Sequence, residues 1–402
     1  MEHMISPDRA LELVLAHVPP TAIETVSLDS SLGRVLAERI VAPEDCPPFI
    51  RAMMDGFAVR AQDAGRSVRV CGEAAAGQAT APRVEPGGCV EIMTGAPCPE
   101  GTEAVVTVEQ TQRVGDHVKL PPNIRKGQHV QPVGALCARA TQTLAPGDRV
   151  TPLVLANLAA FNRERVQVVR MPRVAVISTG NELVRVGEPL QPGAIRDSNG
   201  PMLVAMTREL GVEPVQQHHA RDTDEALRET LNRTASAEVV VFTGGVSMGK
   251  YDLVPRAVEA MGATMVFHKV TQKPGKPLLF AVGQGRLVFG LPGNARSSHF
   301  TFHRYVAAAL RKWIGLAPAP AGGTGVLVAP MSAQSSRTLF LPVRVDRGAP
   351  AGNWLIAPLG DRGSADIYGP VRANAYVRFE PGEHHVAQGE QREFAWMGEH
   401  HG

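Results

Sequence analysis

The chain has 402 residues, 44% of them hydrophobic, and a formal net charge of +2 from 41 basic and 39 acidic side chains. Its length predicts two to four domains with hydrophobic cores, and its composition excludes an intrinsically disordered protein. Because the sequence has neither a dense basic run nor an apolar run near ~18 residues, we expect no nucleic-acid partner and no membrane span.

The N-terminal segment predicts an amphipathic helix rather than a signal sequence. Ser6 is a suitable N-cap, Pro7 fits the first turn, and Pro19 and Pro20 end the helix. Its apolar stripe consists of Leu11, Val14, Leu15 and Val18. The five cysteines are scattered without a C-x-x-C pair, which is typical of reduced thiols in the cytoplasm. We therefore expect a cytoplasmic protein.

Short β-like runs, broken by Gly and Pro, follow between residues 43 and 137. Cys89–Met93 and Ala104–Val108 are two such runs, and they predict a small β module. Residues 138–170 return to mixed structure, with a helix expected near Pro152–Phe161. We interpret the β module as an insertion in an elongated N-terminal domain, which consists of residues 1–42 and 138–170.

Residues 171–316 predict an α/β domain, because short apolar strands alternate with helices. Strands are expected at 174–177, 212–217, 239–242 and 264–270, followed by a hairpin of 278–282 and 287–289. Helices are expected at 201–210, 255–261 and 296–313, and Asp222 with Glu225 opens a fourth as a capping box. This alternation predicts a doubly wound, parallel sheet. After a Pro- and Gly-rich linker, residues 324–396 predict a C-terminal β domain.

Five segments are predicted to lie beyond the carboxyl ends of these strands, where doubly wound sheets bind ligands. They are residues 178–182, 221–222, 243–247, 273–276 and 291–294. Gly244 and Gly245 leave backbone N–H groups able to face an anion. Hydroxyl donors and positive charges come from Thr243, Ser247, Lys273 and Lys276. Glu182, Asp222 and Asp252 offer oxygen ligands for a magnesium ion.

Each of these features also has a purely structural explanation. A Gly-Gly pair after a strand is commonly a turn, and a lysine in a Pro-Gly loop is usually solvated. Asp222 and Asp252 can both cap helices. Only the co-location of the five segments favours a binding site for an anion and a metal.

Histidines and methionines elsewhere in the chain are interpreted as structural. His299 and His303 lie four residues apart on a helix, but the H-E-x-x-H pattern is absent, so we expect surface histidines rather than zinc ligands. The His218-His219 pair is also expected at the surface. The Met53-Met54 pair is expected to be buried.

Longer motifs run in order along nearly the whole chain. Within the α/β region they are Ser178–Leu183, Ile195–Asn199, Thr243–Asp252, Lys273–Pro277 and Gly290–Asn294. Outside it they are Phe49–Ala58, Ile92–Gly101 and Gly363-Ser364. These motifs closely resemble those of the molybdopterin molybdotransferases, the family of MoeA and the gephyrin E domain.

The resemblance implies a homodimer of four-part subunits, with each site between the α/β domain of one copy and the β module of the other. It implies binding of adenylylated molybdopterin and molybdate, magnesium-dependent hydrolysis of the adenylate, and release of AMP and molybdenum cofactor. Other proteins of molybdenum-cofactor biosynthesis are further partners that it suggests.

The resemblance also assigns roles by matching position. The implied catalytic residues are Asp55, Thr94, Glu182, Asp222 and Asp252, of which Glu182, Asp222 and Asp252 would hold magnesium. The implied substrate-binding residues are Thr179, Gly180, Thr243, Gly244, Gly245, Ser247, Lys269, Lys273, Lys276, Pro292, Gly293, Asn294 and Ser364.

The chain departs from the family pattern at several motif positions. They are Ala52, Gln131, Ala135, Leu136, Ala295, Arg296 and Pro342. Two family acids are missing at Ala135 and Leu136, and an expected arginine is missing at Pro342, for which Arg344 is a candidate substitute. The departures leave a second function open: a non-catalytic paralogue that binds molybdopterin or the finished cofactor for storage or delivery.

Overall fold

The computed structural model describes residues 1–77, 81–213, 215–246, 254–319, 322–348, 352–360 and 362–398. The chain divides into two compact units, one of residues 1–37, 149–151 and 166–402 and the other of residues 38–148 and 152–165. No helix within the described ranges combines the length and the apolar character needed to cross a bilayer.

A seven-stranded sheet forms the centre of the first unit. Its strand order is β1 (Glu2–Ile5), β19 (Thr264–Val270), β21 (Leu279–Gly283), β22 (Arg286–Leu291), β18 (Val239–Thr243), β14 (Val174–Thr179) and β17 (Val215–Ala220). Strands β14 and β18 are buried along their whole length, as expected for parallel strands that are covered on both faces. The predicted strands and the predicted hairpin are confirmed.

The sheet is mixed rather than entirely parallel, which corrects the expectation of a parallel sheet. Strand β21 runs antiparallel to β22, to which a tight turn at Gln284 and Gly285, each with positive φ, joins it, and it also runs antiparallel to β19. Strand β1 pairs in parallel with β19 at the edge of the sheet. This N-terminal strand was not predicted.

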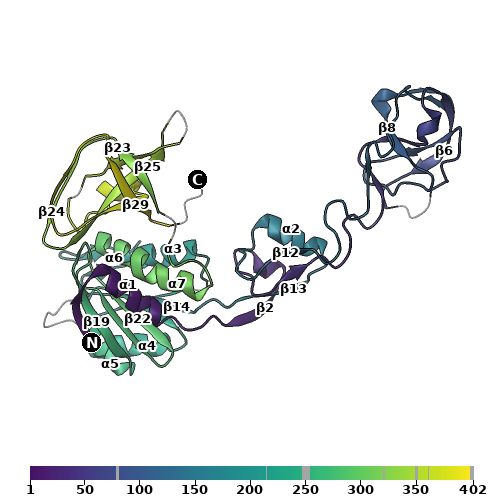
Figure 1. Ribbon diagram of the computed structural model, residues 1–402. Coiled ribbons are helices and arrows are strands. Elements are labelled where there is room, and N and C mark those ends of the chain that lie inside the picture. Colours follow the sequence, from purple (N-terminus) through teal and green to yellow (C-terminus); the bar gives the residue numbers. More distant parts are fainter. Residues whose placement is uncertain are drawn as a thin grey trace. The chain divides into compact units, whose positions relative to one another are not determined.

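Helices cover both faces of the sheet (Figure 1). Side chains of α1 (Pro7–Ala16), α3 (Asn199–Glu209) and α7 (Ala307–Trp313) share one hydrophobic core with the strands. Side chains of α4 (Asp224–Arg233) and α5 (Val254–Ala260) form the core on the opposite face. The predicted helix at 296–313 is present as α6 (Ala295–Thr301), a π-helical segment (Phe302–Val306) and α7.

The helix caps confirm one prediction and correct another. Ser6 Oγ accepts the backbone N–H of Arg9 and caps α1 as predicted. Helix α4 is capped by Thr223, whose Oγ1 accepts the N–H of Ala226, so Asp222 is not the N-cap. Asp222 lies one residue earlier, where its carboxylate is held by a different loop.

The C-terminal part of the first unit is a closed β structure. Five strands form a ring in the order β25 (Thr338–Arg347), β26 (Trp354–Pro358), β23 (Gly322–Leu327), β29 (Gln391–Trp396) and β27 (Ala375–Phe379), which pairs back to β25. Strand β20 (Gln272–Lys273) extends this sheet, and β24 (Met331–Ser335) pairs with β28 (Gly382–Val386). The predicted C-terminal β domain is confirmed, and it is a small barrel.

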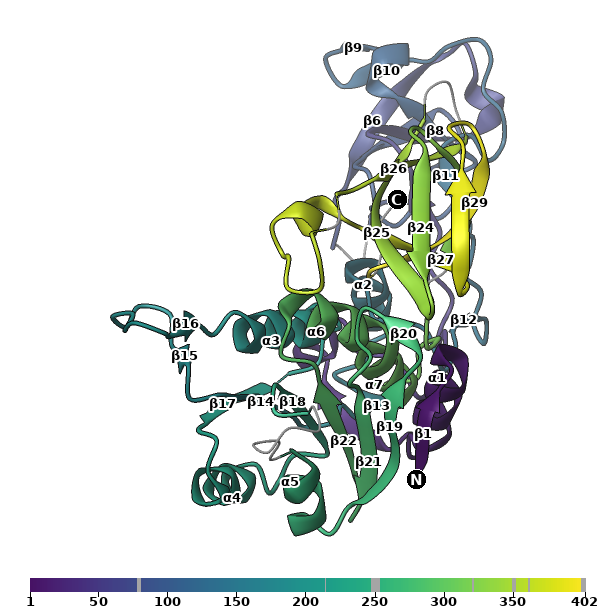
Figure 2. The same cartoon turned by 90° about the vertical axis from the view of Figure 1, so that its left-hand side faces the viewer.

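Two further strand pairs complete the first unit. Strand β2 (Ile23–Ser27), followed by the short helix η1 (Asp29–Ser31), pairs with β13 (Arg165–Val169). Strands β15 (Leu183–Val184) and β16 (Ile195–Arg196) form an arm that projects beyond α3 (Figure 2).

The second unit contains a six-stranded sheet. Its order is β8 (Ala104–Thr107), β5 (Gly56–Val59), β7 (Gly88–Ile92), β6 (Ser67–Ala74), β10 (His117–Lys119) and β9 (Gln112–Val114). Shorter elements are β3 (Ile40–Val41), β4 (Arg51–Ala52), η2 (Ala61–Asp63), η3 (Val108–Gln110), β11 (Val130–Gln131), β12 (Gln142–Leu144) and α2 (Pro152–Ala160). The predicted β module and the predicted helix near residue 152 are confirmed.

Candidate functional site

A cavity of about 870 Å³ opens at the carboxyl ends of β14, β18 and β22. This volume lies within the range of sites for small molecules and cofactors. The predicted site residues that line it are Thr179, Gly180, Glu182, Asp222, Thr243, Gly244, Gly245, Pro292, Gly293 and Asn294. The topology of the sheet therefore brings together residues from four of the five predicted segments.

Gly244 is required where β18 leaves the sheet. Its φ of +92° is unfavourable for other residues, and an added Cβ would lie 2.7 Å from the carbonyl oxygen of Thr179. Gly245 follows with a φ of +62°. Two consecutive residues without side chains leave the backbone at this edge of the cavity uncovered, so a ligand can approach the peptide groups closely.

Asn199 connects the strand ends that form the floor of the cavity. Its Nδ2 donates to Thr243 Oγ1 at 2.9 Å and to the carbonyl oxygen of Gly293 at 2.7 Å. Thr243 Oγ1 also lies 3.2 Å from Ser298 Oγ and 3.3 Å from the carbonyl oxygen of Pro292. This network ties β18, the loop after β22 and the start of α3 to one another.

Two carboxylates lie in the loops at one side of the cavity. Asp222 Oδ2 accepts the backbone N–H of Asn181 at 3.2 Å, and Asn181 Oδ1 accepts the N–H of Asp222 at 3.1 Å. Glu182 lies close to Gly180, where a Cβ would be 2.6 Å from its Oε2. His219 Nε2 is 2.9 Å from the Gly180 carbonyl oxygen. Asp222 is therefore placed by a loop-to-loop contact that capping would not provide.

Asn294 links the cavity to the C-terminal barrel. Its Nδ2 donates to Ser364 Oγ at 2.7 Å, and the N–H of Ser297 donates to the Ser364 carbonyl oxygen at 3.3 Å. Ser364, which was predicted from the resemblance, thus contacts the loop before α6 and the first turn of that helix through hydrogen bonds. It is absent from the described residues that line the cavity itself.

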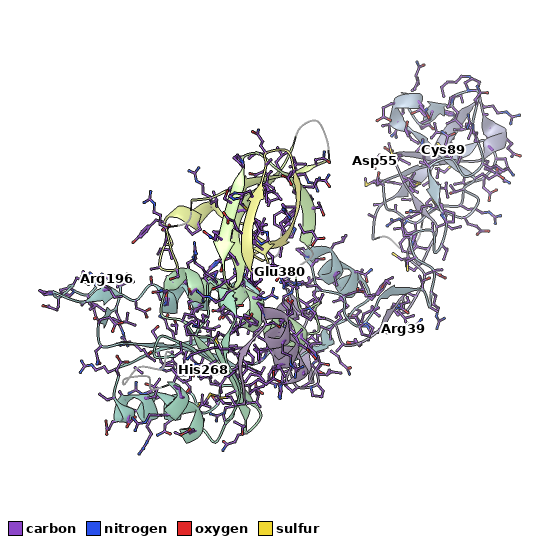
Figure 3. All side chains as sticks on the ribbon, turned by 60° about the vertical axis from the view of Figure 1, so that its left-hand side comes forward. Arg39, Asp55, Cys89, Arg196, His268 and Glu380 are labelled. Carbon is purple, nitrogen blue, oxygen red and sulfur yellow. The ribbon has the colours of Figure 1, made fainter. Side chains whose placement is uncertain are left out.

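The predicted lysines do not belong to the described lining of the cavity. Lys269 and Lys273 are half-buried, and Lys276 is exposed. All three belong to the segment that leads to Pro277, which does line the cavity. Ser247 and Asp252 lie outside the described residues. His268 Nε2 donates to the carbonyl oxygen of Val246, the last described residue before them (3.1 Å; His268 is labelled in Figure 3).

The mouth of the cavity is apolar on two sides. Leu183, Leu190 and Ile195 belong to the arm of β15 and β16, on which Figure 3 labels Arg196. Ile367 and Tyr368 come from the barrel segment before β27. A polar floor with apolar edges suits an amphipathic ligand that carries both an anionic group and a ring system.

The other two predicted catalytic residues, Asp55 and Thr94, belong to the second unit and contact each other (Asp55 is labelled in Figure 3). Asp55 Oδ1 accepts the backbone N–H of Thr94 at 2.6 Å and its hydroxyl at 2.8 Å. The backbone hydrogen bond, followed by the hydroxyl, lowers the pKa of Asp55 below its usual value. The carboxylate is therefore ionised at neutral pH.

Exposed apolar side chains lie in the same two segments as this pair. Met53 is 50% exposed and Met54 is 43% exposed, so the expectation that both are buried is wrong. The two segments are adjacent, because the N–H of Ala52 donates to Ala96 O and the N–H of Gly95 donates to Ala52 O. We call these exposed side chains the apolar face: Phe49, Ile50, Met53, Met54 and Met93.

The departures from the family pattern fall in different environments. Arg344 pairs with Asp346 on the exposed side of β25 and is not among the described residues that line the cavity, so its role as a substitute arginine stays a prediction. Arg296 is almost fully buried, at 2% exposure. Ala295 lines the cavity, and Leu136 is exposed in the second unit.

The histidines on α6 and the following π-helical segment are half-buried rather than exposed, which corrects that expectation. The His299 and His303 rings pack edge to face at 4.7 Å, and His299 Nδ1 lies 3.1 Å from the hydroxyl of Tyr376 on the barrel. Burial lowers the pKa of His299 to about 4. His218 and His219 on β17 are half-buried rather than exposed. Packing by the barrel, which no local pattern encodes, covers α6.

Asn199 is one of several cavity residues that the predicted site set lacks. It closes the motif Ile195–Asn199, which the sequence comparison had singled out, and it begins α3 at the carboxyl end of β14. A polar residue at the start of a helix that follows a strand end is the signal that could have identified it.

Known proteins share these features along almost the whole chain. Family models match at residues 5–162 (MoeA N-terminal region, domain I and II), 175–312 (probable molybdopterin binding domain) and 324–395 (MoeA C-terminal region, domain IV). A molybdopterin molybdenumtransferase of Bacillus subtilis is 33% identical over 383 residues, which are 92% of this chain and 89% of the relative. One from a Nostoc species is 36% identical over 73% of this chain and 70% of the relative.

Solved structures agree with the sequence relatives. The crystal structure of a molybdopterin biosynthesis MoeA protein from Pyrococcus horikoshii superposes with a TM-score of 0.80 at 31% identity, covering 99% of this chain and 100% of that one. A second structure of a MoeA protein from Pyrococcus horikoshii gives a TM-score of 0.78 at 26% identity, over 98% of this chain and 100% of that one.

Proposed function

The chain belongs to the MoeA family of molybdopterin molybdenumtransferases, and on that premise we propose that it inserts molybdate into adenylylated molybdopterin. The proposed reaction hydrolyses the adenylate and releases AMP and molybdenum cofactor. The relatives' shared name assigns the chain to molybdenum-cofactor biosynthesis, and it does not favour the non-catalytic alternative. We place the reaction in the cytoplasm, in keeping with the five free cysteines.

The observation that carries the proposal is the composition of the cavity. Its floor is formed by strand-end loops in which Gly244 and Gly245 leave the backbone uncovered, next to hydroxyl and amide groups of Thr243 and Asn199. Such a floor can hold phosphate oxygens through N–H and O–H donors. The apolar mouth can accommodate the ring systems of the same substrate.

The donor set of the cavity also fits magnesium, although no group of three or more potential ligands occurs among the described residues. Glu182 and Asp222 line the cavity from neighbouring loops. Magnesium is commonly held by one or two carboxylates together with substrate phosphates and waters, so two carboxylates suffice. When bound, the ion would supply positive charge against the adenylate phosphate. We propose that Glu182 and Asp222 hold it, with Asp252 as a third ligand.

The lysines supply the remaining positive charge in this proposal. Lys273 is fixed by β20, whose pairing with β25 ties it to the barrel, and Lys276 lies three residues further along the same loop. An ammonium group beside the cavity attracts molybdate as a point charge and contributes about 1.5–3 kcal/mol where it forms a charged hydrogen bond. We propose that these lysines recruit molybdate, whereas the glycine floor binds the adenylate.

The apolar face of the second unit supports a homodimer. Methionine and phenylalanine side chains that stay about half exposed around an ionised carboxylate are typical of a surface that another protein covers. We propose that a second copy covers it with its α/β domain, so that Asp55 and Thr94 complete the partner's site. The four domains inferred from the sequence, with boundaries near residues 43, 137, 171 and 324, form part of this proposal.

The test is incubation of the protein with adenylylated molybdopterin, molybdate and magnesium, followed by measurement of AMP. We expect AMP release that requires magnesium and is lost in Glu182→Gln. Glu188→Gln is the matched control, because Glu188 lies six residues further along the chain, between β15 and β16, and does not belong to the described lining of the cavity. Tight substrate binding without AMP release under any condition would overturn the proposal in favour of a binding protein.

A further inference from the structure

Tyr368 stands out at the mouth of the cavity. Among the large hydrophobic side chains that the structure describes, it is the most exposed, at 82%. Single exposed hydrophobic residues are common on protein surfaces and carry no meaning alone. Tyr368, however, is one of the residues that line the cavity, together with its neighbour Ile367, so it is within reach of a ligand bound there.

The backbone that carries Tyr368 is held in place by Asp366. Asp366 Oδ1 accepts the N–H groups of Tyr368 at 2.9 Å and of Gly369 at 3.0 Å, and the N–H of Asp366 donates to Gly363 O at 3.2 Å. These hydrogen bonds, led by that of Gly369, lower the pKa of Asp366. The short helix η5 (Gly369–Arg372) follows directly. The tyrosine is thus presented by an anchored turn rather than by a loose loop.

A second part of the cavity lining is also apolar and also anchored. Leu190 and Ile195 line the cavity from the arm of β15 and β16, and they are 52% and 56% exposed. The N–H of Ile195 donates to the carbonyl oxygen of Glu182 at 2.8 Å, which fixes this part to the proposed metal-binding loop. Figure 2 shows the arm and the yellow-green segment before β27 on the same side of the sheet.

From this arrangement we propose that Tyr368 stacks on a fused heteroaromatic ring of the substrate, with Leu190 and Ile195 against the other face of that ring. The polar floor then binds the attached phosphate. Aromatic stacking is tolerant of ring type and needs only a flat π-face, which suits an exposed phenol ring on a fixed backbone. The inference rests on the proposed function, whose substrate carries two such rings, the pterin and the adenine.

The experiment measures binding by calorimetry with three probes: AMP, a soluble pterin, and ribose 5-phosphate as a ligand without a ring. The variants are Tyr368→Ala, Tyr368→Phe and, as a control, Val371→Ala. Val371 is an exposed residue of the adjoining helix η5 and lies outside the described lining of the main cavity. We expect Tyr368→Ala to lower the affinity for a ring-bearing probe by about tenfold or more and to leave the affinity for ribose 5-phosphate unchanged.

Tyr368→Phe should bind within about twofold of the wild type, because stacking does not require the hydroxyl. If Tyr368→Ala loses affinity for AMP alone, Tyr368 stacks on the adenine, and if it loses affinity for the pterin alone, Tyr368 stacks on the pterin. A loss of affinity for both probes means that Tyr368 accepts either ring. Equal affinities of wild type and Tyr368→Ala for both ring probes would overturn the inference. The inference would also be overturned if Tyr368→Ala lost equal affinity for ribose 5-phosphate, or if Val371→Ala lost as much affinity for the ring probes. A disturbed turn would then explain the effect.

The AMP-release assay keeps this inference separate from the proposed function. A wild type whose ring binding depends on Tyr368 but which releases no AMP overturns the proposed reaction and leaves the stacking intact. A wild type that releases AMP while Tyr368→Ala binds every probe normally overturns the stacking alone.

Discussion

The cavity of the seven-stranded sheet and the Asp55–Thr94 pair of the small β module present their polar groups in opposite ways. In the cavity, Thr243 is almost fully buried and its hydroxyl is held by neighbouring loops at the strand ends. In the module, Asp55 is exposed, and Thr94 is the hydrogen-bond donor to its carboxylate among the residues that the structure describes. The geometry of the cavity follows from the topology of one sheet. The Asp55–Thr94 pair instead places a charge within an apolar face that is suited to contact with another protein.

This contrast teaches where each copy of the protein is self-sufficient. Gly244, Asn199 and Asp222 are placed by contacts within the first unit, so a single copy forms the floor that receives phosphate. The apolar face, in contrast, is not packed within its own unit. Its exposed methionines would gain free energy if another surface buried them. The proposed dimer adds Asp55 and Thr94 of one copy to a floor that the other copy already forms.

The largest effect is expected from mixing two inactive variants. Asp55→Asn and Glu182→Gln should each lower AMP release by about 100-fold to 1000-fold, since each removes a charge near the reacting phosphate. Coexpressed together, they should recover about one quarter of wild-type activity, because half of randomly formed dimers contain one copy of each and one of their two sites is intact. The measurement is AMP release from the purified mixture.

The matched control for this mixture is Glu182→Gln coexpressed with Asp222→Asn. Both substitutions lie in the same cavity, so no dimer of these two variants contains an intact site. If the mixture with Asp55→Asn recovers no more activity than this control, then the two regions do not act together and the proposed site between copies is wrong.

Gly244→Ala tests whether the cavity floor depends on backbone access. The new Cβ would meet the Thr179 carbonyl oxygen at 2.7 Å, so the loop must move, and we expect AMP release to fall by about 100-fold. Gly285→Ala is the control, because it has a similar positive φ of +74° in open space. Both variants should lose about 1–2 kcal/mol of stability from backbone strain, measured by thermal unfolding. Equal activity of the two would show that the floor tolerates the displacement.

Met53→Asp tests the other region. A charge in the apolar face should weaken the dimer by about 100-fold, because the carboxylate would be buried without a partner. Sedimentation at micromolar concentration should then show monomers, whereas Val114→Asp, an exposed position on β9 of the same unit, should leave the dimer intact. A dimer that withstands Met53→Asp, or a wild type that sediments as a monomer, would remove this face from the proposed interface.

The same contrast explains what the sequence could predict. The strand-end segments were accessible because short apolar strands and Gly-rich turns are local patterns, and parallel strands deliver their ends to one edge. Strand β1 was not, since Glu2–Ile5 pairs with residues more than 260 positions away. The burial of His299 and His303 was missed because the barrel, including Tyr376, covers them. The exposure of Met53 was missed because hydrophobicity alone does not distinguish a core from an interface.

Adjacent polar residues set a finer limit on prediction. Asp222 and Thr223 are both suitable N-caps, and the periodicity of α4 does not separate them. The choice is made by Asn181 on a distant loop, which exchanges two hydrogen bonds with Asp222 and leaves the cap to Thr223. Asn199 shows the same limit, since its two partners, at the end of β18 and just after β22, lie 44 and 94 residues further along the chain.

The smallest effect is expected from Thr94→Val, which removes one of the two donors to Asp55 and retains the shape of the side chain. The backbone N–H is the stronger cause of the lowered pKa of Asp55 and remains in the variant, so the pKa should rise only part of the way toward its usual value. Because the pKa of Asp55 is lower in the folded chain, its contribution to stability is present above the unfolded pKa and is lost as the pH falls through the folded pKa. The variant should therefore lose this contribution at a slightly higher pH than the wild type, below about pH 4 in both.

A carboxyl titration by carbon-13 NMR measures the shift directly, with Thr94→Ser as the control that keeps the hydroxyl. At neutral pH, where Asp55 is ionised in every variant, AMP release should change only a few-fold. An unchanged pKa in Thr94→Val would mean that the hydroxyl does not donate to Asp55 in solution, and the backbone N–H would then be its only support from Thr94.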